Sequence, residues 1–368
     1  MGKWKFIKIL VFISIFIIAS FGVKGGVVEN LNIPRAIGYD IQKNQDTMVQ
    51  YIVPIEVYTQ NGMDFSSKVD IGIANNIGET RENRQLKANK KFLLGLEKAI
   101  LINEEQARFG IDGILDILID NPQINDRATV AICKQKATDI LNYRTKDIKS
   151  ATEYIDGMIE NSYQYNFLAK HYTVIDTVIR SGLEGVNMVI PYVEINNNNI
   201  EITGLAIFNK DKMVLKTNID DMKIINLLRE NKVYGILTLQ ENSKQYINYY
   251  ARSKRKVKCE REGDKYRFII DLNLNGDIIS NELYENMRNN NNVIEEFKNN
   301  MALQVEAQCN DLINKMKKEY KMDIINLGKV AAAKYGKGTG EDWNKVVCNS
   351  DILVNVKVKI DKEGRGSY

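Results

Sequence analysis

A chain of 368 residues, 44% hydrophobic and 27% charged, has the composition of a folded protein of about two domains. Its 51 Lys and Arg residues nearly balance 47 Asp and Glu residues, and a net charge of +4 does not indicate a nucleic-acid partner. The single histidine, His171, excludes zinc sites built from two or three imidazoles of one chain. Any Ser-His-Asp or Cys-His mechanism would depend on that residue alone.

Residues 1–23 have the pattern of an export signal. Lys3, Lys5 and Lys8 precede and flank the apolar run 9–19, which gives a positively charged n-region followed by a hydrophobic h-region. The run is shorter than the ~20 apolar residues of a comfortable membrane span, so both a cleaved signal peptide and a retained N-terminal membrane anchor fit it. In both cases the rest of the chain crosses a membrane and the lysines stay in the cytoplasm.

Strand-like and helix-like patterns alternate in the expected N-terminal domain, residues 24–195. Runs rich in β-branched and aromatic residues predict strands, and apolar residues at helical spacing predict helices. The predicted strands are 32–39, 48–58, 98–103 and 127–134, and the predicted helices are 86–97, 104–119, 137–141 and 154–179. The second helix should stop at Asn121-Pro122, because the residue before a proline disfavours the α region.

A polar asparagine tract at 196–199 marks the expected boundary with a C-terminal domain, 196–368, for which a further division into 196–250 and 251–368 is an alternative. The predicted strands beyond it are 200–208, 212–216, 233–239, 246–260, 265–274 and 352–360, and the predicted helices are 220–229 and 293–320. Together these elements predict a multi-domain α+β or mixed α/β fold, with mostly antiparallel or mixed sheets flanked by helices.

Residues 271–282 match the ligand spacing of an EF-hand calcium loop. The candidate ligands are Asp271, Asn273, Asn275, Asp277 and Glu282. A helix should lead into such a loop, whereas 265–271 has the pattern of a strand, and Asn275-Gly276 is well placed for a hairpin turn. We therefore expect a strand and a turn here, and we predict no metal site and no other cofactor.

The densest basic run of the chain is 252–261. On a strand, Lys254, Lys256 and Lys258 would point the same way. The simplest interpretation is a ladder of charge that faces solvent and blocks pairing between strand edges. Contact with anionic lipid headgroups is the functional alternative. Nucleic acid fits less well, because no set of stacking aromatic residues accompanies the run.

No other residue pattern predicts a catalytic site. The glycine-rich segment 336–340 completes no phosphate-binding motif and is typical of a turn. His171 has no identifiable acid, base or metal partner, so we expect a structural or surface histidine. The cysteines form no Cys-x-x-Cys pair, which favours free thiols, with one or two disulfides as the alternative. They are Cys133, Cys259, Cys309 and Cys348.

A family resemblance runs through the chain after the export signal. Its most characteristic block is 110–127 (GIDGILDILIDNPQINDR), followed by ATV at 128–130 and ATDIL at 137–141. Further matching segments are 31–40 (LNIPRAIGYD), 51–57, 77–80, 93–95, 98–100, 204–208, 211–214, 327–328 and Trp343. In this order and spacing the chain resembles the Ger(x)C family, the GerC-like C subunits of spore germinant receptors.

The resemblance implies a non-enzymatic, membrane-associated subunit on the outer face of the spore inner membrane. It would act with a GerA-type subunit and a polytopic GerB-type subunit to sense nutrients and trigger germination. The resemblance assigns no residue that binds the nutrient. Family members usually carry a lipid-modified cysteine at the signal junction, where this chain has Gly22 and Val23, and no cysteine precedes Cys133. We therefore expect no lipidation and an anchor formed by the uncleaved segment 9–23.

Two alternative functions, from other functional classes than a receptor subunit, also remain open. An exported soluble ligand- or calcium-binding module, independent of any receptor complex, would also carry an export signal. A secreted hydrolase is supported by nothing beyond the size of the chain.

Overall fold

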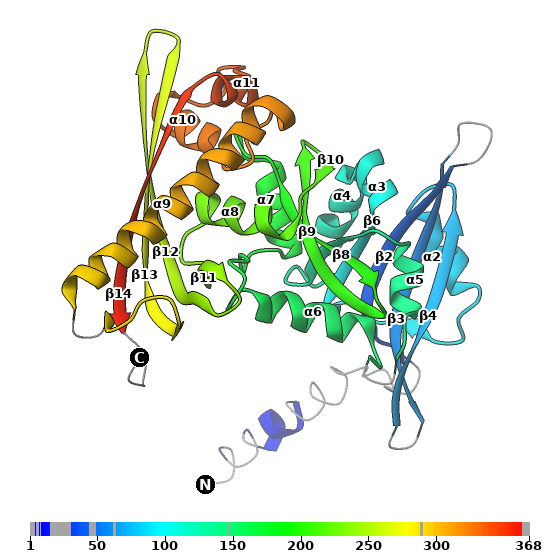
Figure 1. Ribbon diagram of the computed structural model, residues 1–368. Coiled ribbons are helices and arrows are strands. Elements are labelled where there is room, and N and C mark those ends of the chain that lie inside the picture. The colour runs from blue at the N-terminus through cyan, green and yellow to red at the C-terminus, as the bar shows by residue number, and fades with distance from the viewer. Residues whose placement is uncertain are drawn as a thin grey trace.

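An eight-stranded sheet and a four-stranded sheet carry the fold of the computed structural model (Figure 1). The structure describes residues 31–362, apart from 44–48, 62–63, 146–147 and 288–289, together with residues 4, 7 and 9–14. A two-stranded parallel pair, β1 (Leu31–Asn32) and β5 (Lys91–Phe92), lies outside both sheets. Helices flank both large sheets, which confirms the expected multi-domain α+β fold with mixed sheets.

The larger sheet has the strand order β10-β9-β8-β7-β6-β2-β3-β4. The bounds are β2 (Pro34–Lys43), β3 (Val49–Asn61), β4 (Asp64–Ala74), β6 (Ala99–Asn103), β7 (Thr129–Cys133), β8 (Val189–Asn196), β9 (Asn199–Asn209) and β10 (Lys212–Lys216). The central strands β2, β6, β7 and β8 run parallel to one another, and antiparallel strands flank them on both sides. The two innermost strands, β6 and β7, are mostly apolar because both of their faces are buried.

Alternate residues of β6 enter two different cores, Leu101 on one face of the sheet and Ile102 on the other. The first face packs against α5 (Ala137–Asn142), α6 (Ala151–Ser162) and α8 (Ile219–Arg229). The second face packs against α3 (Glu104–Phe109), α4 (Asp112–Asp120) and α7 (Val174–Ser181). The helix α2 (Glu79–Gln85) packs against β4, where Gly72 has no Cβ to collide with the carbonyl of Thr80.

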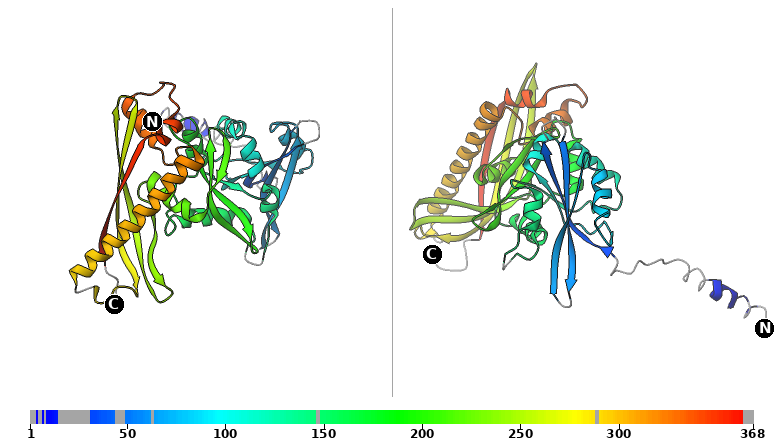
Figure 2. Two further views of the ribbon diagram at one scale, coloured as in Figure 1. Left: turned by 45° about the horizontal axis from the view of Figure 1, so that its top comes forward. Right: turned by 90° about the vertical axis from the view of Figure 1, so that its right-hand side faces the viewer.

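The smaller sheet has the order β11-β12-β13-β14, and only β14 runs parallel to its neighbour. The long helix α9 lies along one face of this sheet (Figure 2). The bounds are β11 (Tyr234–Asn242), β12 (Gln245–Glu262), β13 (Lys265–Asn281), β14 (Asp351–Lys362), α9 (Asn291–Lys315), a π-helical turn η3 (Met316–Tyr320), α10 (Leu327–Tyr335) and α11 (Trp343–Cys348). Residues such as Phe268 and Phe297 form the core between the sheet and α9.

Each of the ten predicted strands is confirmed. They correspond to β2, β3, β6, β7, β9, β10, β11, β12, β13 and β14. The predicted helices 137–141, 220–229 and 293–320 are also confirmed, and α4 ends one residue before Asn121-Pro122 as expected.

The asparagine tract at the expected domain boundary is a hairpin turn. Asn197 and Asn198 both have positive φ, and Asn196 pairs with Asn199 where β8 turns into β9. The chain therefore stays in the larger sheet across residue 196. The expected division into domains 24–195 and 196–368 stays a prediction. The strands β9 and β10 complete the sheet that the N-terminal residues begin.

The predicted helix 86–97 is wrong. The helix lies earlier, in α2, because Asn76 accepts a hydrogen bond from the backbone N–H of Glu79 at its start. The following residues form a loop and β5, which pairs with β1, and Gly95 at φ +107 does not allow a helix to continue. The predicted helix 104–119 is likewise divided into α3 and α4 at Gly110, whose φ is +140.

The predicted helix 154–179 is also divided, into α6 and α7, because the residues between them bridge to other elements. Asn166 bridges to Gly235 in β11, and Thr173 bridges to Thr129 in β7.

The predicted turn at Asn275-Gly276 is wrong as well. Gly276 lies within β13, and the turn between β12 and β13 is at Gly263, where Glu262 pairs with Lys265. A Cβ at Gly276 would lie 1.9 Å from the carbonyl oxygen of Tyr250. The glycine therefore allows β12 and β13 to approach closely at this point.

The predicted export segment falls mainly outside the described residues. Within it, residues 9–14 are helical and exposed. Among the helices that the structure describes, none combines the length and apolar character that a membrane crossing requires.

Candidate functional site

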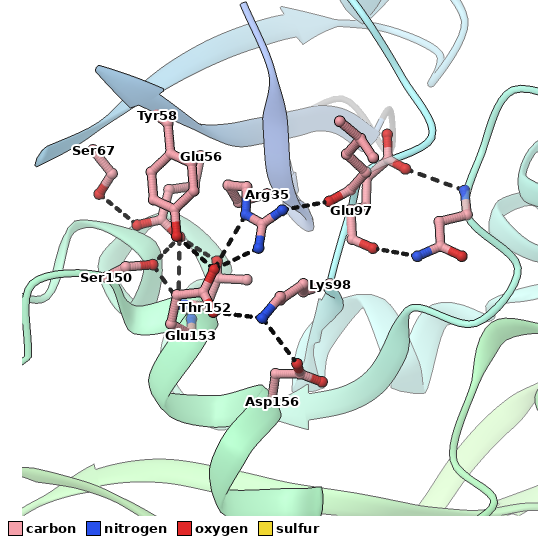
Figure 3. Close-up of polar contacts among 12 residues, drawn as sticks. Arg35, Glu56, Tyr58, Ser67, Glu97, Lys98, Ser150, Thr152, Glu153 and Asp156 are labelled. Carbon is pink, nitrogen blue, oxygen red and sulfur yellow. Dashed lines mark hydrogen bonds and ion pairs between the residues drawn. The ribbon is translucent and has the colours of Figure 1, made fainter. Parts of the chain in front are cut away.

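A cluster of charged side chains joins the beginning of α6 to the larger sheet (Figure 3). Its centre is Glu153, which receives hydrogen bonds from three elements. Arg35 in β2 donates from Nη2 at 2.6 Å, the Tyr58 hydroxyl in β3 donates at 2.6 Å, and Lys98 before β6 donates at 2.7 Å. We refer to Arg35, Tyr58, Lys98, Glu153 and Asp156 as the α6 cluster.

Glu153 stays ionised in this cluster. Burial acts to raise its pKa, but the hydrogen bonds from Lys98, Tyr58 and Arg35 outweigh burial and lower the pKa to about 2. Burial and the hydrogen bond to Glu153 raise the pKa of Tyr58 to about 12, so the phenol remains a proton donor. Arg35 also stacks over the Tyr58 ring, 4.9 Å from its centroid.

The position of Glu153 follows from how α6 begins. The Ser150 hydroxyl caps the helix by accepting the backbone N–H of Glu153 at 3.3 Å. The glutamate therefore stands in the first turn, where the helix dipole favours a negative charge. The pattern Ser-x-x-Glu at 150–153 is a helix-start signal, whereas the helix was predicted to start at residue 154.

A second carboxylate, Glu56 of β3, lies beside the α6 cluster and is fully buried. Arg144 pairs with it at 2.7 Å, and Ser67 donates to it at 2.6 Å. The Ser150 hydroxyl donates to it at 3.3 Å, and Thr152 donates from both its backbone and its hydroxyl. Each donor comes from this chain, so Glu56 fastens the α5 to α6 loop and the start of α6 to the sheet.

A cavity of about 380 Å³ opens on the other side of α6. Asp156, the member of the α6 cluster that also lines this cavity, accepts the Thr129 hydroxyl at 2.8 Å and lies 3.9 Å from Lys98. Burial raises the pKa of Asp156, and Thr129 and Lys98 oppose the rise. Arg127 and Lys170 also line the cavity.

The hydrogen bonds and ion pairs of the α6 cluster connect structural elements of this chain to one another. Glu56 and Glu153 each accept several donors from this chain, which fixes α6 against β2 and β3. The sequence analysis singled out none of these residues. Arg35 and Glu153 are 118 positions apart, and no local spacing connects them.

The candidate calcium ligands do not converge. Asp271, Asn273, Asn275 and Asp277 are alternate residues of β13, so successive side chains lie roughly 7 Å apart along one face. Asp271 instead accepts a hydrogen bond from Asn355 of β14 at 3.0 Å. Within the described residues, no three or more His, Cys, Asp or Glu side chains are grouped to hold a metal ion.

The remaining residues from the sequence analysis lie as follows. His171 is on the surface, with its side chain 66% exposed and Nδ1 3.9 Å from Asp176. The segment 336–340 is a loop, in which the N–H of Gly338 donates to Glu184 at 2.8 Å. All four cysteines are free, as preferred, and burial raises the pKa of each thiol, in Cys309 to about 12.

The basic run forms part of a charged surface. Lys254, Lys256 and Lys258 are exposed on one face of β12, as predicted, while Arg255 and Val257 between them are partly buried. The strand register places further basic residues on the same face, which we call the basic sheet face. It consists of Arg252, Lys254, Lys256, Lys258, Arg267, Lys357 and Lys359, with Glu260, Asp271 and Asp351 as interspersed acids.

Comparisons with known proteins agree along the chain. Residues 27–195 match the model described as the spore germination protein N-terminal domain, and residues 203–364 match the model described as spore germination B3/GerAC like, C-terminal. Spore germination protein GerQC of Bacillus cereus is 22% identical over 99% of both chains. Putative spore germination protein YfkR of Bacillus subtilis (strain 168) is 24% identical over 62% of this chain and 59% of its own.

A solved structure has the same fold. The crystal structure of the GerBC protein matches with a TM-score of 0.52 and 15% sequence identity, over 89% of this chain and 98% of that chain. The two family models succeed each other in order along the chain and together cover most of it. The chain therefore belongs to the GerC-like family of spore germination proteins.

Proposed function

We propose that this chain is the non-enzymatic C subunit of a spore nutrient germinant receptor, which acts with GerA-type and GerB-type membrane subunits to trigger germination. The observation that carries the proposal is the ordered pair of family domains, 27–195 and 203–364. The similarity to GerQC over 99% of both chains supports it. In this proposal the subunit acts by binding its partners, and the α6 cluster holds its N-terminal part in shape.

The proposal locates the chain on the outer face of the spore inner membrane. Lys3, Lys5 and Lys8 with the apolar run 9–19 support this location, since they have the pattern of an export signal or anchor. With no cysteine near Gly22 and Val23, the segment 9–23 itself would hold the chain at the membrane.

The basic sheet face is the surface that would contact the membrane. Its lysines and arginines are exposed on one side of a sheet whose other side is covered by α9. Anionic lipid headgroups attract such side chains by roughly 1 kcal/mol for each Lys or Arg near the surface. Charge complementarity therefore supports an anionic bilayer as the occupant of this face.

The first test is purification of the tagged chain from detergent-solubilised spore membranes, with the co-purified proteins identified by mass spectrometry. We expect the GerA-type and GerB-type subunits to co-purify with it. A tagged chain with residues 1–23 replaced by a cleavable signal peptide is the matched control for the anchor. Recovery of the intact chain alone, in the soluble fraction, would contradict the proposal and favour an exported ligand-binding module.

A further inference from the structure

An apolar cavity of about 320 Å³ lies beneath α2, on the face of the larger sheet that carries α4. The sheet contributes side chains of β2 and β3 to its floor, and β5 and the end of α4 close its sides. Most of its lining is aliphatic or aromatic, including Ile37, Val53, Ile55, Phe92, Leu118 and Ile124. We call this cavity the Arg84 pocket, after the one buried cation in its wall.

Arg84 is only 6% exposed, and its guanidinium has few partners. Nη1 donates to the carbonyl of Val53 at 3.2 Å, and the guanidinium lies 5.2 Å from the centroid of the Phe92 ring. Nε is buried and has no hydrogen-bond partner among the described residues. No carboxylate of the described chain lies within 4 Å of this guanidinium, as an ion pair would require.

Within the described residues, no acid near the pocket forms an ion pair with Arg84. Glu82, which also lines the cavity, is exposed, and Asp70 attracts Arg84 only at longer range. Asp70 pairs with Lys68 at 2.9 Å. Glu97, which is fully buried, accepts the backbone N–H groups of Gly95 and Asn125. Burial consequently lowers the pKa of Arg84 to about 10, although it remains charged at neutral pH. A buried cation without a counterion is costly, and proteins seldom keep one that has no use.

A hydroxyl lies near Arg84 in the same pocket. Tyr39 is buried, lines the cavity, and has no side-chain hydrogen-bond partner among the described residues. Burial raises its pKa to about 12, and its environment includes the charges of Arg81 and Arg84. The phenol therefore stays protonated and can donate a hydrogen bond. The pocket thus combines an apolar volume with two neighbouring donors, a guanidinium and a hydroxyl.

We propose that the Arg84 pocket binds a small apolar carboxylate. The carboxylate would pair with Arg84 and accept the hydroxyl of Tyr39, and the hydrocarbon part would lie among the aliphatic and aromatic side chains. The volume is at the lower end of the range for small-molecule sites, which limits the tail to a short branched chain or a single ring. This binding needs no partner subunit and no membrane, so it stands apart from the proposed function.

The same charges set the selectivity. An α-ammonium group on the ligand would stand near Arg81 and Arg84, with the exposed Glu82 as the one acid of the lining, and would lose its hydration in an apolar cavity. A desamino acid should therefore bind more tightly than the matching amino acid. A neutral alcohol with the same tail would fill the cavity but leave Arg84 without a counterion.

The experiment is isothermal titration calorimetry of the full chain in detergent with 4-methylpentanoate, 4-methylpentanol, leucine and inorganic phosphate. We expect 4-methylpentanoate to bind most tightly, by roughly 10- to 100-fold over the alcohol, since a hydrogen bond to a charged group is at stake. Equal affinities for the acid and the alcohol, or no binding of the acid at millimolar concentration, would overturn the proposal. Tighter binding of phosphate than of 4-methylpentanoate would overturn the proposal that the pocket selects a ligand with an apolar tail.

Two variants locate the site. Arg84→Met removes the charge and keeps most of the length, so binding of 4-methylpentanoate should fall to the level of the alcohol. Arg127→Met removes an exposed arginine outside this pocket and should leave both affinities unchanged. If Arg84→Met does not fold, Ile124→Phe, which fills the cavity from a half-buried position, replaces it and should weaken both ligands. Unchanged binding in the folded variant would contradict the assignment.

Discussion

Arg35 and Glu153, 118 residues apart in the sequence, lie with Nη2 and Oε1 at 2.6 Å where β2 meets the start of α6. The pair is half-buried, with side chains 14% and 33% exposed, and Tyr58 and Lys98 share the same carboxylate. Because its four members come from four separate segments, this contact constrains the larger sheet and α6 together. Its removal should therefore affect the whole N-terminal part of the fold.

Glu153→Gln should lower the free energy of unfolding by about 1–2 kcal/mol at neutral pH. The amide removes the charge that attracts Arg35 and Lys98, and partial exposure of the site limits the loss. Urea denaturation followed by circular dichroism measures the change. Glu160→Gln, an exposed glutamate on the same helix, is the control and should be nearly neutral. A loss of equal size in both variants would contradict a specific role for Glu153.

The contribution of Glu153 should depend on pH in the acid range. Its pKa is about 2 in the folded chain and about 4.5 ordinarily, so folding favours the ionised form. The stability it gives is fully present above pH 4.5 and is lost as the pH falls toward 2. The difference in unfolding free energy between the wild type and Glu153→Gln should therefore shrink between these limits. A difference that stays constant from pH 6 to about pH 3 would refute the linkage.

The central elements could be predicted from sequence because their signals are local. The runs at 98–103 and 127–134 are apolar and β-branched, and they form β6 and β7, which are buried on both faces. The stop of α4 before Asn121-Pro122 follows from proline geometry alone. The helix predicted at 86–97 was wrong because pairing of Lys91 and Phe92 with β1 outweighs helical spacing.

The α6 cluster and the Arg84 pocket could not be predicted in the same way. Glu153 and Glu56 are ordinary glutamates in the sequence, and only the packing of α6 on the sheet brings Arg35 and Arg144 to them. Arg84 lies on a helix whose other arginine, Arg81, is exposed. Its burial depends on contact between α2 and β4 at Gly72, which no spacing in the sequence encodes.

Gly276→Ala should destabilise the smaller sheet. The new Cβ would lie 1.9 Å from the carbonyl oxygen of Tyr250, so β12 and β13 must separate locally, at a cost of about 1–3 kcal/mol. Thermal unfolding of the variant measures the cost. Gly113→Ala is the matched control, because it lies in α4 with nothing within 4 Å of its Cβ, and it should be neutral or slightly stabilising. An unchanged melting temperature for Gly276→Ala would contradict the strand pairing described above.

The basic sheet face should determine binding to anionic membranes. Replacing Lys254, Lys256 and Lys258 by Gln removes three charges from one side of β12. Each lysine near an anionic surface contributes roughly 1 kcal/mol, so the loss of three lysines should lower the affinity for vesicles containing phosphatidylglycerol by about 100-fold. Co-sedimentation with vesicles measures this loss, with the chain lacking residues 1–23 used throughout so that the apolar segment does not contribute.

A second triple variant keeps the change in net charge the same. Lys136, Lys210 and Lys337 are exposed on other parts of the molecule, and their replacement by Gln should weaken vesicle binding much less. Raising the salt concentration should weaken the wild type and bring it close to the β12 variant, because exposed charges are screened over about 10 Å at 0.1 M salt. Equal losses in the two triple variants would show that net charge alone governs binding. They would exclude the basic sheet face as the membrane-contacting surface, since the two sets of lysines carry the same charge and differ only in their position on the molecule.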